Sequence, residues 1–228
     1  MVERTARYDG LAEWYDELVS SLGPTGAGLE ALCRLVGPGD GSCLDLGCGT
    51  GIAIRPLAEL GWAVTGVDVS ADQLRIAKRR AGRFARRLMR ADAVDLPLSA
   101  GSFDAVASMW THTDFDDAAA AFSEVWRVLR TGGRFVYVGS HPCFLSPTVE
   151  RRVDEPHVLH PGYRREEWWQ DAPGFRLGRE GIRGRAGVHH LTLAGFLNAI
   201  LRSDLRLAHV EEPGDDDYPY LFAFVAVK

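Results

Sequence analysis

The chain has 228 residues, 46% of them hydrophobic, which is enough for one large α/β core and argues against extensive disorder. Its net charge of −5 disfavours a dedicated nucleic-acid-binding protein, which is usually basic. The sequence has no apolar run of membrane-spanning length and no N-terminal signal-peptide pattern. Because its four cysteines form no Cys-x-x-Cys pair, we expect reduced thiols, no metal site and a cytoplasmic location.

Residues 1–39 are expected to form helices that precede the core. Within 8–20, a stretch with two Tyr-Asp pairs, the apolar residues share one helical face that includes Tyr15. A second helix is predicted over 25–36, before a Gly-Pro-Gly stop. Trp14 either covers a ligand or packs on the core, and the sequence leaves both open.

A glycine-rich turn organises the rest of the chain. An apolar strand over 42–46 runs into Gly47-Cys48-Gly49-Thr50-Gly51, and a helix is expected over 52–60. Glycines let the backbone bend sharply and let a ligand approach, and the unpaired N–H groups of the helix start would favour an anion. A second buried strand over 62–68 then closes on Asp68.

The spacing of the glycines separates two nucleotide-binding families. Dinucleotide-binding domains prefer G-x-G-x-x-G, whereas here the glycines run G-x-G-x-G and Asp45 precedes the first by two residues. This pattern resembles motif I of class I S-adenosylmethionine-dependent methyltransferases, of the small-molecule type. The resemblance implies an α/β fold with a Rossmann-like, seven-stranded, mostly parallel sheet, helices on both faces and a terminal antiparallel strand. It also implies S-adenosylmethionine as the cofactor.

Asp68 ends its strand next to the glycine turn, where a carboxylate can accept hydrogen bonds from both hydroxyls of a ribose. The alternative role is to cap the helix predicted over 71–82. Ser70 and Gln73 already form a capping box for that helix, so Asp68 is expected to face a ligand.

Further motifs follow in register. A strand over 88–93 ends in Ala-Asp-Ala, which resembles motif II, where the acid binds the adenine amino group. A fourth strand over 105–110 delivers its last residues to the same edge. The resemblance assigns cofactor binding to Tyr15, Asp45, Gly47, Cys48, Gly49, Gly51, Asp68, Val69, Gln73, Asp92, Ala93, Met109 and Trp110.

Two other stretches have a structural interpretation. The arginine-rich stretch over 78–90 is interpreted as the solvated back of a helix rather than a nucleic-acid site. Thr113 or Asp114 is expected to cap a helix that reaches residue 129, and a glycine pair at 132–133 is expected to separate this helix from the fifth strand.

The pattern changes after the fifth strand. Residues 40–140 form the expected cofactor-binding core, whereas 141–190 is rich in proline, arginine and aromatic residues and is expected to cover the substrate. Residues 191–228 should supply a helix and two strands, completing a single domain. The predicted substrate contacts are Trp14, Trp110, His112, His141, Tyr163, Trp168 and Trp169, although each cap aromatic could equally staple the cap to the core.

A histidine would suit proton removal near neutral pH. His112 follows the fourth strand by two residues and is the first choice as general base, with His189 or His190 entering from the cap, and Tyr15 as a lid residue near the methyl group. The alternative for His112 is a structural hydrogen bond in the turn.

The sequence thus predicts a methyltransferase that acts by in-line transfer on a small, aromatic or partly apolar molecule, at O, N or C. We expect no nucleic-acid or membrane partner and a possible homodimer. The alternatives are an RNA or protein methyltransferase, a non-catalytic S-adenosylmethionine-binding protein and, disfavoured by the glycine spacing, a nicotinamide oxidoreductase.

Overall fold

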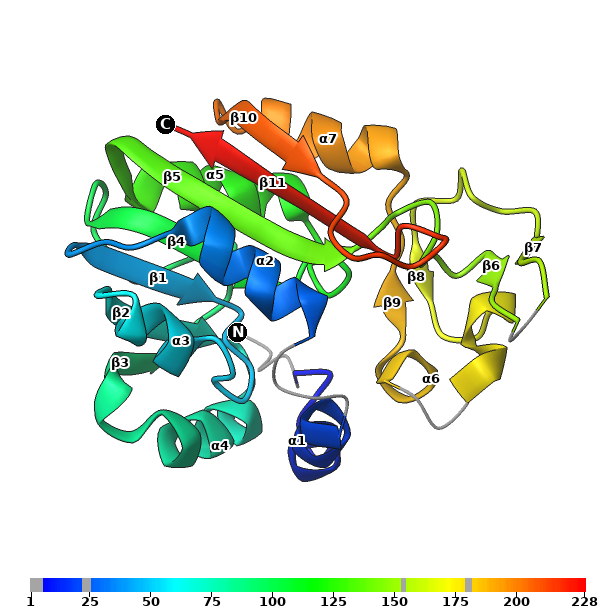
Figure 1. Cartoon of the computed structure of the whole chain (residues 1–228), viewed down its shortest axis with the longest axis horizontal. Helices are drawn as coiled ribbons and strands as arrows, with labels where there is room; N and C mark the ends of the chain where they lie inside the picture. The colour runs from blue at the N-terminus through cyan, green and yellow to red at the C-terminus, as the bar shows by residue number, and fades with distance from the viewer. Residues whose placement is uncertain (1–5, 22–25, 153–154, 179–181) are drawn as a thin grey trace.

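Seven strands form one sheet at the centre of the computed structural model, which describes residues 6–21, 26–152, 155–178 and 182–228 (Figure 1). The strand order is β10-β11-β5-β4-β1-β2-β3. The strands are β1 (Ser42–Leu46), β2 (Ala63–Asp68), β3 (Ala85–Arg90), β4 (Phe103–Met109), β5 (Leu129–Ser140), β10 (Arg206–Glu211) and β11 (Leu221–Val227).

The direction of the strands places the site. Strands β3, β2, β1, β4 and β5 are parallel, β11 is antiparallel to β5, and β10 is antiparallel to β11. The predicted fold class is therefore confirmed. Because β1 pairs with both β2 and β4, the chain reverses its direction of progress across the sheet at β1, and the crevice at the carboxyl ends of these strands is the expected ligand site.

Helices cover both faces of the sheet (Figure 1). One face packs against α2 (Ala27–Val36), α3 (Ile54–Glu59) and α4 (Ala71–Ala81), which continues into a short 3₁₀ turn, η1 (Gly82–Phe84). The other face packs against α5 (Ala118–Val128) and α7 (Leu193–Leu201). Residue 25, where the second helix was expected to start, lies outside the described residues.

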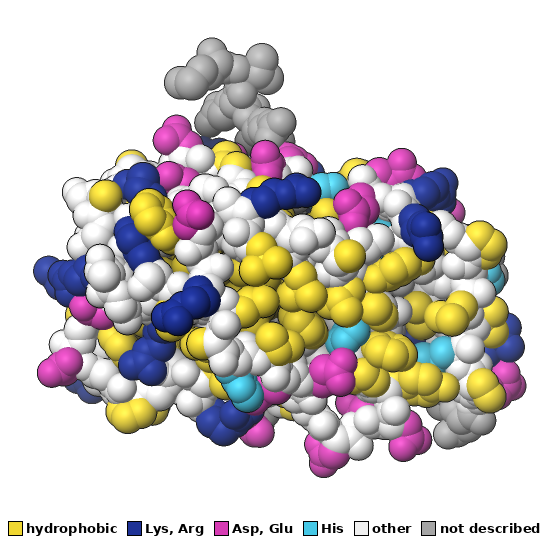
Figure 2. Space-filling model, turned by 90° about the horizontal axis from the view of Figure 1, so that it is seen from above, with side chains coloured by type: hydrophobic (Ala, Val, Ile, Leu, Met, Phe, Trp, Pro, Cys, Tyr) yellow, Lys and Arg dark blue, Asp and Glu magenta, His cyan; other side chains and the backbone are white. Residues whose placement is uncertain are grey.

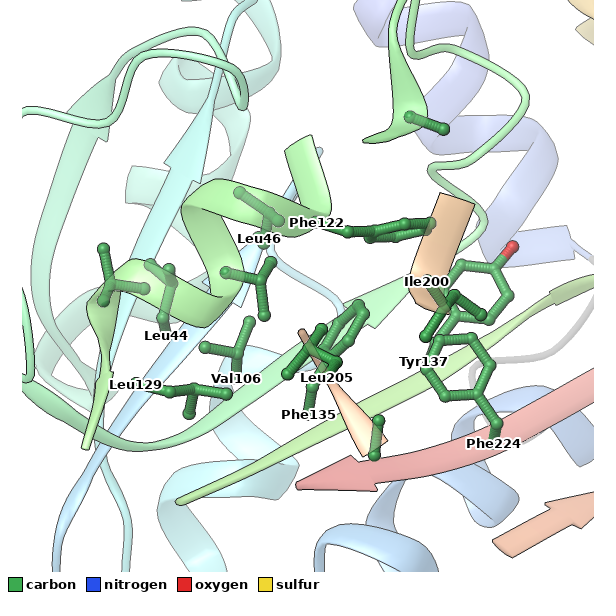
Figure 3. Packing of buried hydrophobic residues seen from close by; sticks show 14 of the residues in the cluster. Leu44, Leu46, Val106, Phe122, Leu129, Phe135, Tyr137, Ile200, Leu205 and Phe224 are labelled. Atoms are coloured by element: carbon green, nitrogen blue, oxygen red, sulfur yellow. The ribbon is translucent and has the colours of Figure 1, made fainter. Parts of the chain in front are cut away.

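An aromatic cluster fills the space between the sheet and α5 and α7. Phe122, Phe135, Tyr137, Phe196 and Phe224 are fully buried, and Figure 3 shows four of these side chains lying together. Tyr137 and Phe224 stack with ring centroids 5.3 Å apart, and Phe135 meets Phe224 edge to face at 5.3 Å. Each such side chain contributes about 1.5–3 kcal/mol by leaving water, so this cluster supports the sheet beneath the crevice.

The first helix, α1 (Ala12–Ser21), is held against α4 by ion pairs. Arg75 Nη1 lies 2.7 Å from Glu13 Oε1, and Arg80 Nη1 lies 2.6 Å from Asp16 Oδ1. Arg79 also contacts Glu13, at 3.1 Å. The cations of the 78–90 stretch are exposed except for Arg80, as expected of a solvated helix back, and Arg79 and Arg80 also form ion pairs with α1.

The segment after β5 forms small structures of its own. They are β6 (Val149–Glu150), β7 (Val158–Leu159), β8 (Trp168–Trp169), η2 (Pro173–Gly178), α6 (Ile182–Ala186) and β9 (Val188–His189). Strand β6 pairs with β7 and β8 pairs with β9, both antiparallel. Figure 1 shows these elements beyond the carboxyl end of β5, on the side to which β1 also points. Residues 153–154 and 179–181 of the predicted cap lie outside the described residues.

Three predicted boundaries were wrong. The third strand begins at Ala85 rather than at residue 88, because its pairing with β2 starts directly after η1, where Ala85 lies opposite Val64. Helix α5 is capped by Asp117, whose carboxylate accepts a hydrogen bond from the Ala120 N–H at 2.9 Å, and not by Thr113 or Asp114. Strand β5 follows α5 directly, so the glycine pair at 132–133 lies inside the strand, where the β4–β5 register shifts.

Hydrophobic side chains form a band on the face of the molecule seen from above in Figure 2. Leu201 and Val210, at the end of α7 and on β10, are 56% and 47% exposed. The homodimer expected from the sequence stays a prediction. Within the described ranges, no helix has the length and apolar character needed to cross a membrane.

Candidate functional site

The glycine turn after β1 is tied to the neighbouring strand. The N–H groups of Gly47 and Cys48 donate to the Val67 carbonyl at 2.8 and 2.9 Å. Gly47 has a φ of 68°, and a Cβ at this position would lie 2.3 Å from Thr111 Cγ2. Both the left-handed backbone and the close approach of the loop after β4 therefore require glycine here.

The amides of this turn are largely used within the protein. The Gly49 N–H donates to Asp68 Oδ2 at 2.8 Å, and the Gly51 N–H donates to the Cys48 carbonyl at 2.8 Å. Helix α3 begins only at Ile54, whose N–H contacts the Gly51 carbonyl at 3.4 Å. The helix therefore starts later than predicted, and the binding of an anion by its N-terminal N–H groups stays a prediction.

Two buried carboxylates instead dominate the electrostatics of the crevice. Burial, and then the neighbouring charge of Asp68, raise the pKa of Asp45 to about 7, and Asp45 Oδ2 has no hydrogen-bond partner. Burial also raises the pKa of Asp68 to about 6, against hydrogen bonds from the Ser70 and Gly49 N–H groups that lower it. A site with two buried acids and an unpaired oxygen favours a ligand that brings donors or positive charge.

Gln73 adds a third acceptor. Its N–H donates to the Ser70 hydroxyl at 3.2 Å, as the predicted capping box requires, but its side chain does not return the bond. The Ser70 N–H donates to Asp68 Oδ1 instead, so Asp68 both caps α4 and faces the crevice. Gln73 Oε1 is buried and unpaired and lies 3.7 Å from the position of a Cβ on Gly49.

These groups line one cavity of about 1010 Å³. Its wall contains every predicted cofactor residue except Gly51; their role in binding stays a prediction. Gly51 lies behind the wall, where a Cβ would approach Ala77 to 3.1 Å, so this glycine allows α4 to pack against the turn. Trp110 lines the cavity with a φ of 64°, and its ring lies close to Gly28 of α2.

The cavity continues beyond the carboxyl ends of the strands. The N-terminal segment contributes Tyr8 and Tyr15, whose rings meet edge to face with centroids 5.3 Å apart. The cap contributes an apolar wall made of Leu145, Pro147, Val149, Phe175, Ile182 and Val188. One continuous space therefore joins the acidic crevice to an apolar chamber under the cap.

The structure contradicts the choice of His112 as general base. His112 is 2% exposed, lies outside the cavity wall, and its Nδ1 is hydrogen-bonded to the Tyr137 hydroxyl. Its ring packs against Phe196 with centroids 4.6 Å apart, and burial lowers its pKa to about 3. Thr111 and Thr113 line the cavity, whereas the residue between them points to the core.

The other predicted bases also fail on geometry. His189 Nδ1 lies 2.6 Å from the Phe115 carbonyl and His190 Nε2 lies 2.7 Å from the Tyr163 carbonyl, and neither side chain reaches the cavity wall. Tyr15 does line the cavity, but burial raises its pKa to about 12, so its hydroxyl stays protonated near neutral pH.

Most of the predicted substrate contacts are structural. Among them only Trp110 lines the cavity. His141 lies 2.8 Å from Glu212 Oε1, and the hydroxyl of Tyr163 accepts the Leu193 N–H at 2.8 Å.

The tryptophans predicted to touch substrate pack elsewhere. The Arg185 guanidinium lies 4.3 Å from the ring centroid of Trp14, and the Arg7 guanidinium lies 3.8 Å from that of Trp168. Trp169 is buried in the small core of the cap. Trp168 and Trp169 therefore stabilise the cap and its contact with the N-terminal segment.

Sequence reasoning missed a polar cluster on the cavity wall, made of Tyr8, Thr113, Asp114 and Arg183. Tyr8 belongs to one of the two Tyr-Asp pairs, and Asp114 was noticed only as a helix cap. No periodic signal surrounds Arg183, which lies on a helix of five residues.

Known proteins resemble this chain in sequence and in structure. Residues 44–137 match the methyltransferase domain family. A demethylmenaquinone methyltransferase of Tropheryma whipplei is 35% identical over 145 residues, which cover 61% of this chain and 61% of that protein. An O-methyltransferase of Penicillium expansum is 36% identical over 126 residues, covering 51% of this chain and 46% of that protein. The chain thus matches about three fifths or less of the length of these relatives.

A solved structure extends the likeness to nearly the whole chain. An S-adenosylmethionine-dependent methyltransferase from Mesorhizobium loti superposes with a TM-score of 0.72 and 28% identity, covering 90% of this chain and 100% of that one. Residues 44–137, which include the glycine turn and its two acids, thus match the methyltransferase domain family, and nearly the whole chain shares the fold of an S-adenosylmethionine-dependent methyltransferase.

Proposed function

We propose that this protein transfers the methyl group of S-adenosylmethionine to a small molecule with an apolar body. The observation that carries the proposal is the continuous cavity, whose acidic end lies on the glycine turn and whose apolar end lies under the cap. Its volume of about 1010 Å³ is at the upper end of the range for a single ligand, so there is room for a donor and an acceptor.

The residues at the acidic end fit the cofactor. The unpaired oxygens of Asp45 and Gln73 could accept hydrogen bonds from an ammonium group, and Asp68 has lone pairs left for ribose hydroxyls. When bound, S-adenosylmethionine supplies a methyl group on a sulfonium that is already a good leaving group. The chain would hold the acceptor in line and keep water out under α1 and the cap.

The two-sided wall of the cavity also supports a small acceptor over RNA or protein. Tyr8 and Tyr15 line it on one side, and residues of the cap line it on the other. The relatives of Tropheryma and Penicillium are named for a demethylmenaquinone and for O-methylation, which agrees with a small molecule as substrate.

Cofactor binding is tested by calorimetry with S-adenosylmethionine on Asp68→Asn. The change to Asn keeps one acceptor oxygen for the Gly49 or Ser70 N–H, so the turn should survive. Loss of a charged hydrogen bond is worth about 1.5–3 kcal/mol, which predicts an affinity lower by about tenfold to a hundredfold. Asp104→Asn is the matched control, because Asp104 also accepts a backbone N–H, from Ser42, but lies outside the cavity.

Turnover is tested by the release of S-adenosylhomocysteine in the presence of small acceptors, an RNA pool or a protein pool. Release with small acceptors supports the proposal, and release only with RNA or protein overturns it. Tight binding of S-adenosylmethionine with no release in any mixture would indicate a non-catalytic binding protein. Binding of NAD in place of S-adenosylmethionine would contradict the family's cofactor for this chain.

A further inference from the structure

A carboxylate stands where the acidic and apolar ends of the cavity meet. Asp114 lies in the loop between β4 and α5 and lines the cavity with a side chain that is 24% exposed. Both of its carboxylate oxygens are 3.4 Å from the Tyr8 hydroxyl, and Oδ1 is 3.3 Å from Arg183 Nη1. Three distant parts of the chain, the N-terminal segment, this loop and α6, therefore converge on one side chain.

The contacts of Asp114 hold it in place without saturating it. Charge-assisted hydrogen bonds are usually about 2.7–2.9 Å long, and all three contacts to this carboxylate are longer. The shorter bond of Arg183 goes from Nη2 to Thr113 Oγ1 at 2.6 Å, and Arg7 donates to the backbone carbonyl of Asp114 at 2.6 Å. Because a carboxylate has about four lone-pair positions, Asp114 can still accept a hydrogen bond from a ligand.

Asp114 is also close to the cofactor end. Its negative charge contributes to the raised pKa of Asp68, the predicted ribose acid, and to the raised pKa of Tyr15. The apolar wall is also near, because Ile182 precedes Arg183 on α6, and the N–H of His189, the residue after Val188, donates to the Thr113 carbonyl at 2.7 Å. A flat apolar acceptor resting on that wall could present a polar group to both the donor methyl and Asp114.

We propose that Asp114 is the catalytic proton acceptor and that the acceptor group is a phenolic or enolic hydroxyl, which makes the reaction an O-methylation. This inference rests on the proposed function. In the step, a lone pair of the acceptor oxygen bonds to the methyl carbon as the carbon–sulfur bond breaks and its electron pair stays on sulfur. The O–H bond breaks as well, and its proton passes to the Asp114 carboxylate and later to solvent.

The charges around Asp114 favour a neutral hydroxyl over a cationic amine. Arg183 and Arg7 face the carboxylate, and their positive charges would oppose an ammonium group at the same place. An aliphatic alcohol is too weak an acid for a carboxylate, whereas a phenol, with a pKa of about 10, is within reach when methyl transfer proceeds at the same time.

The basicity of Asp114 agrees with this role. Burial raises its pKa, while Arg183, Arg7 and the Tyr8 hydroxyl lower it, and the balance lies above the ordinary value of 3.8. On the neighbouring elements, Tyr15 and Asp68 also face it. A carboxylate with a raised pKa is a stronger base, and its pKa lies closer to that of a phenol.

The test uses the full chain with S-adenosylmethionine and three probe acceptors. At pH 8, 4-nitrophenol is mostly ionised and needs little help from a base, 2-naphthol is mostly protonated, and benzylamine represents the amines. We expect Asp114→Asn to lower kcat for 2-naphthol by about 10²–10⁴, and for 4-nitrophenol by much less. The affinity for S-adenosylmethionine should stay within about twofold of the wild type.

The control variant is Asp204→Asn, the same chemical change at an exposed position with a φ of 63°, which Asn tolerates. It should behave as wild type. Asp114→Glu is the second variant, used if Asp114→Asn fails to fold. It retains a carboxylate and should keep part of the activity. In the wild type kcat/KM should fall at acidic pH, and this limb should move to higher pH in Arg183→Leu, because the guanidinium lowers the pKa of Asp114.

Three results would overturn the inference. They are turnover confined to benzylamine, a rate with 2-naphthol within about fivefold of wild type in a folded Asp114→Asn, and no methylation of either phenol. Turnover of benzylamine alone would leave the proposed function intact and remove Asp114 as the base. If the protein binds S-adenosylmethionine but methylates none of the three probes, the wider acceptor screen decides. Turnover in that screen would remove only the proposal of a phenolic acceptor and Asp114 as its base. No turnover there would count against the proposed function as well.

Discussion

Asp45→Asn should make the protein more stable and a poorer binder of S-adenosylmethionine. Asp45 lies on β1 between Gly66 of β2 and Ala107 of β4, with Oδ2 buried and unpaired. Burial is the main cause of its raised pKa of about 7, compared with 3.8 for an ordinary aspartate. In the absence of ligand, the folded state therefore carries a carboxylate that would be better solvated in the unfolded chain.

The size and sign of the effect follow from this pKa. The interval from 3.8 to about 7 corresponds to at most about 4 kcal/mol of destabilisation when Asp45 is fully ionised. Because the folded pKa is the higher one, the penalty is absent below pH 3.8, grows as the pH rises and is complete above pH 7. Since Asn still buries an amide, we expect a gain of about 2 kcal/mol at pH 8, or about 4–8 °C in Tm. At pH 4.5 the penalty on Asp45 is only about 1 kcal/mol, so the variant should be less stable than the wild type by about 1 kcal/mol.

The assay is thermal and urea unfolding of the ligand-free protein at pH 4.5, 6.5 and 8, followed by calorimetry with S-adenosylmethionine. Affinity should fall by about tenfold to a hundredfold because the ammonium loses its charged partner. Asp104→Asn is a control of opposite sign, since a hydrogen bond from the Ser42 N–H and the Arg130 guanidinium lower the pKa of Asp104, and the variant should lose stability at neutral pH. An Asp45→Asn protein less stable than wild type at pH 8 would refute the assignment of an unpaired buried charge.

Three further variants test the turn, the core and a helix cap. Gly49→Val should lose detectable S-adenosylmethionine binding in calorimetry, because Gly49 has a φ of 51° and a side chain there would enter the cavity beside Gln73; wild-type affinity would contradict the placement of the ligand. His112→Leu leaves the Tyr137 hydroxyl unpaired and should cost about 1–3 kcal/mol in urea unfolding at pH 7 without changing cofactor affinity. Since the folded pKa of His112 is about 3, the wild type should also lose stability as the pH falls below 6.5, and this loss should be smaller in the variant. Asp117→Ala should cost about 1 kcal/mol through the lost N-cap, and an unchanged urea midpoint would show that the cap is not made in solution.

The cofactor end of the cavity could be predicted because its determinants are local. The glycine turn, Asp45 and Asp68 sit at the ends of adjacent strands, and the position of a strand end follows from short apolar runs and glycine spacing. The double role of Asp68 was not predictable, because a carboxylate can accept the Ser70 N–H and still have capacity for a ligand. The pattern showed which residues meet, but not how their hydrogen bonds are shared.

The acceptor end depended on contacts that no local pattern encodes. His112 was placed correctly just after β4, but it lies in a turn closed by a hydrogen bond from the Asp114 N–H to the Thr111 carbonyl at 2.9 Å. In this turn Thr111 and Thr113 line the cavity, whereas His112 is buried outside its wall. The cap contains only two short two-stranded sheets, so it needs buried side chains of its own, and Trp169 and Phe175 supply them. Aromatic richness in such a segment therefore indicates a small core at least as strongly as a substrate site.

The carboxylates at the two ends of the cavity differ in whether they have a counter-charge, and this difference agrees with the ligand proposed for each end. Asp45 is left unpaired at the cofactor end, so a positively charged ligand relieves a cost that the empty protein carries. Asp114 has Arg183 as a permanent counter-charge, which lowers its pKa and offsets part of the effect of burial without a cationic ligand. The same residue type thus selects a cation where it stands alone and can take a proton from a neutral hydroxyl where it is paired. The aromatic core around Phe135 and Phe224 forms without a ligand, and its burial offsets the cost of the unpaired carboxylate.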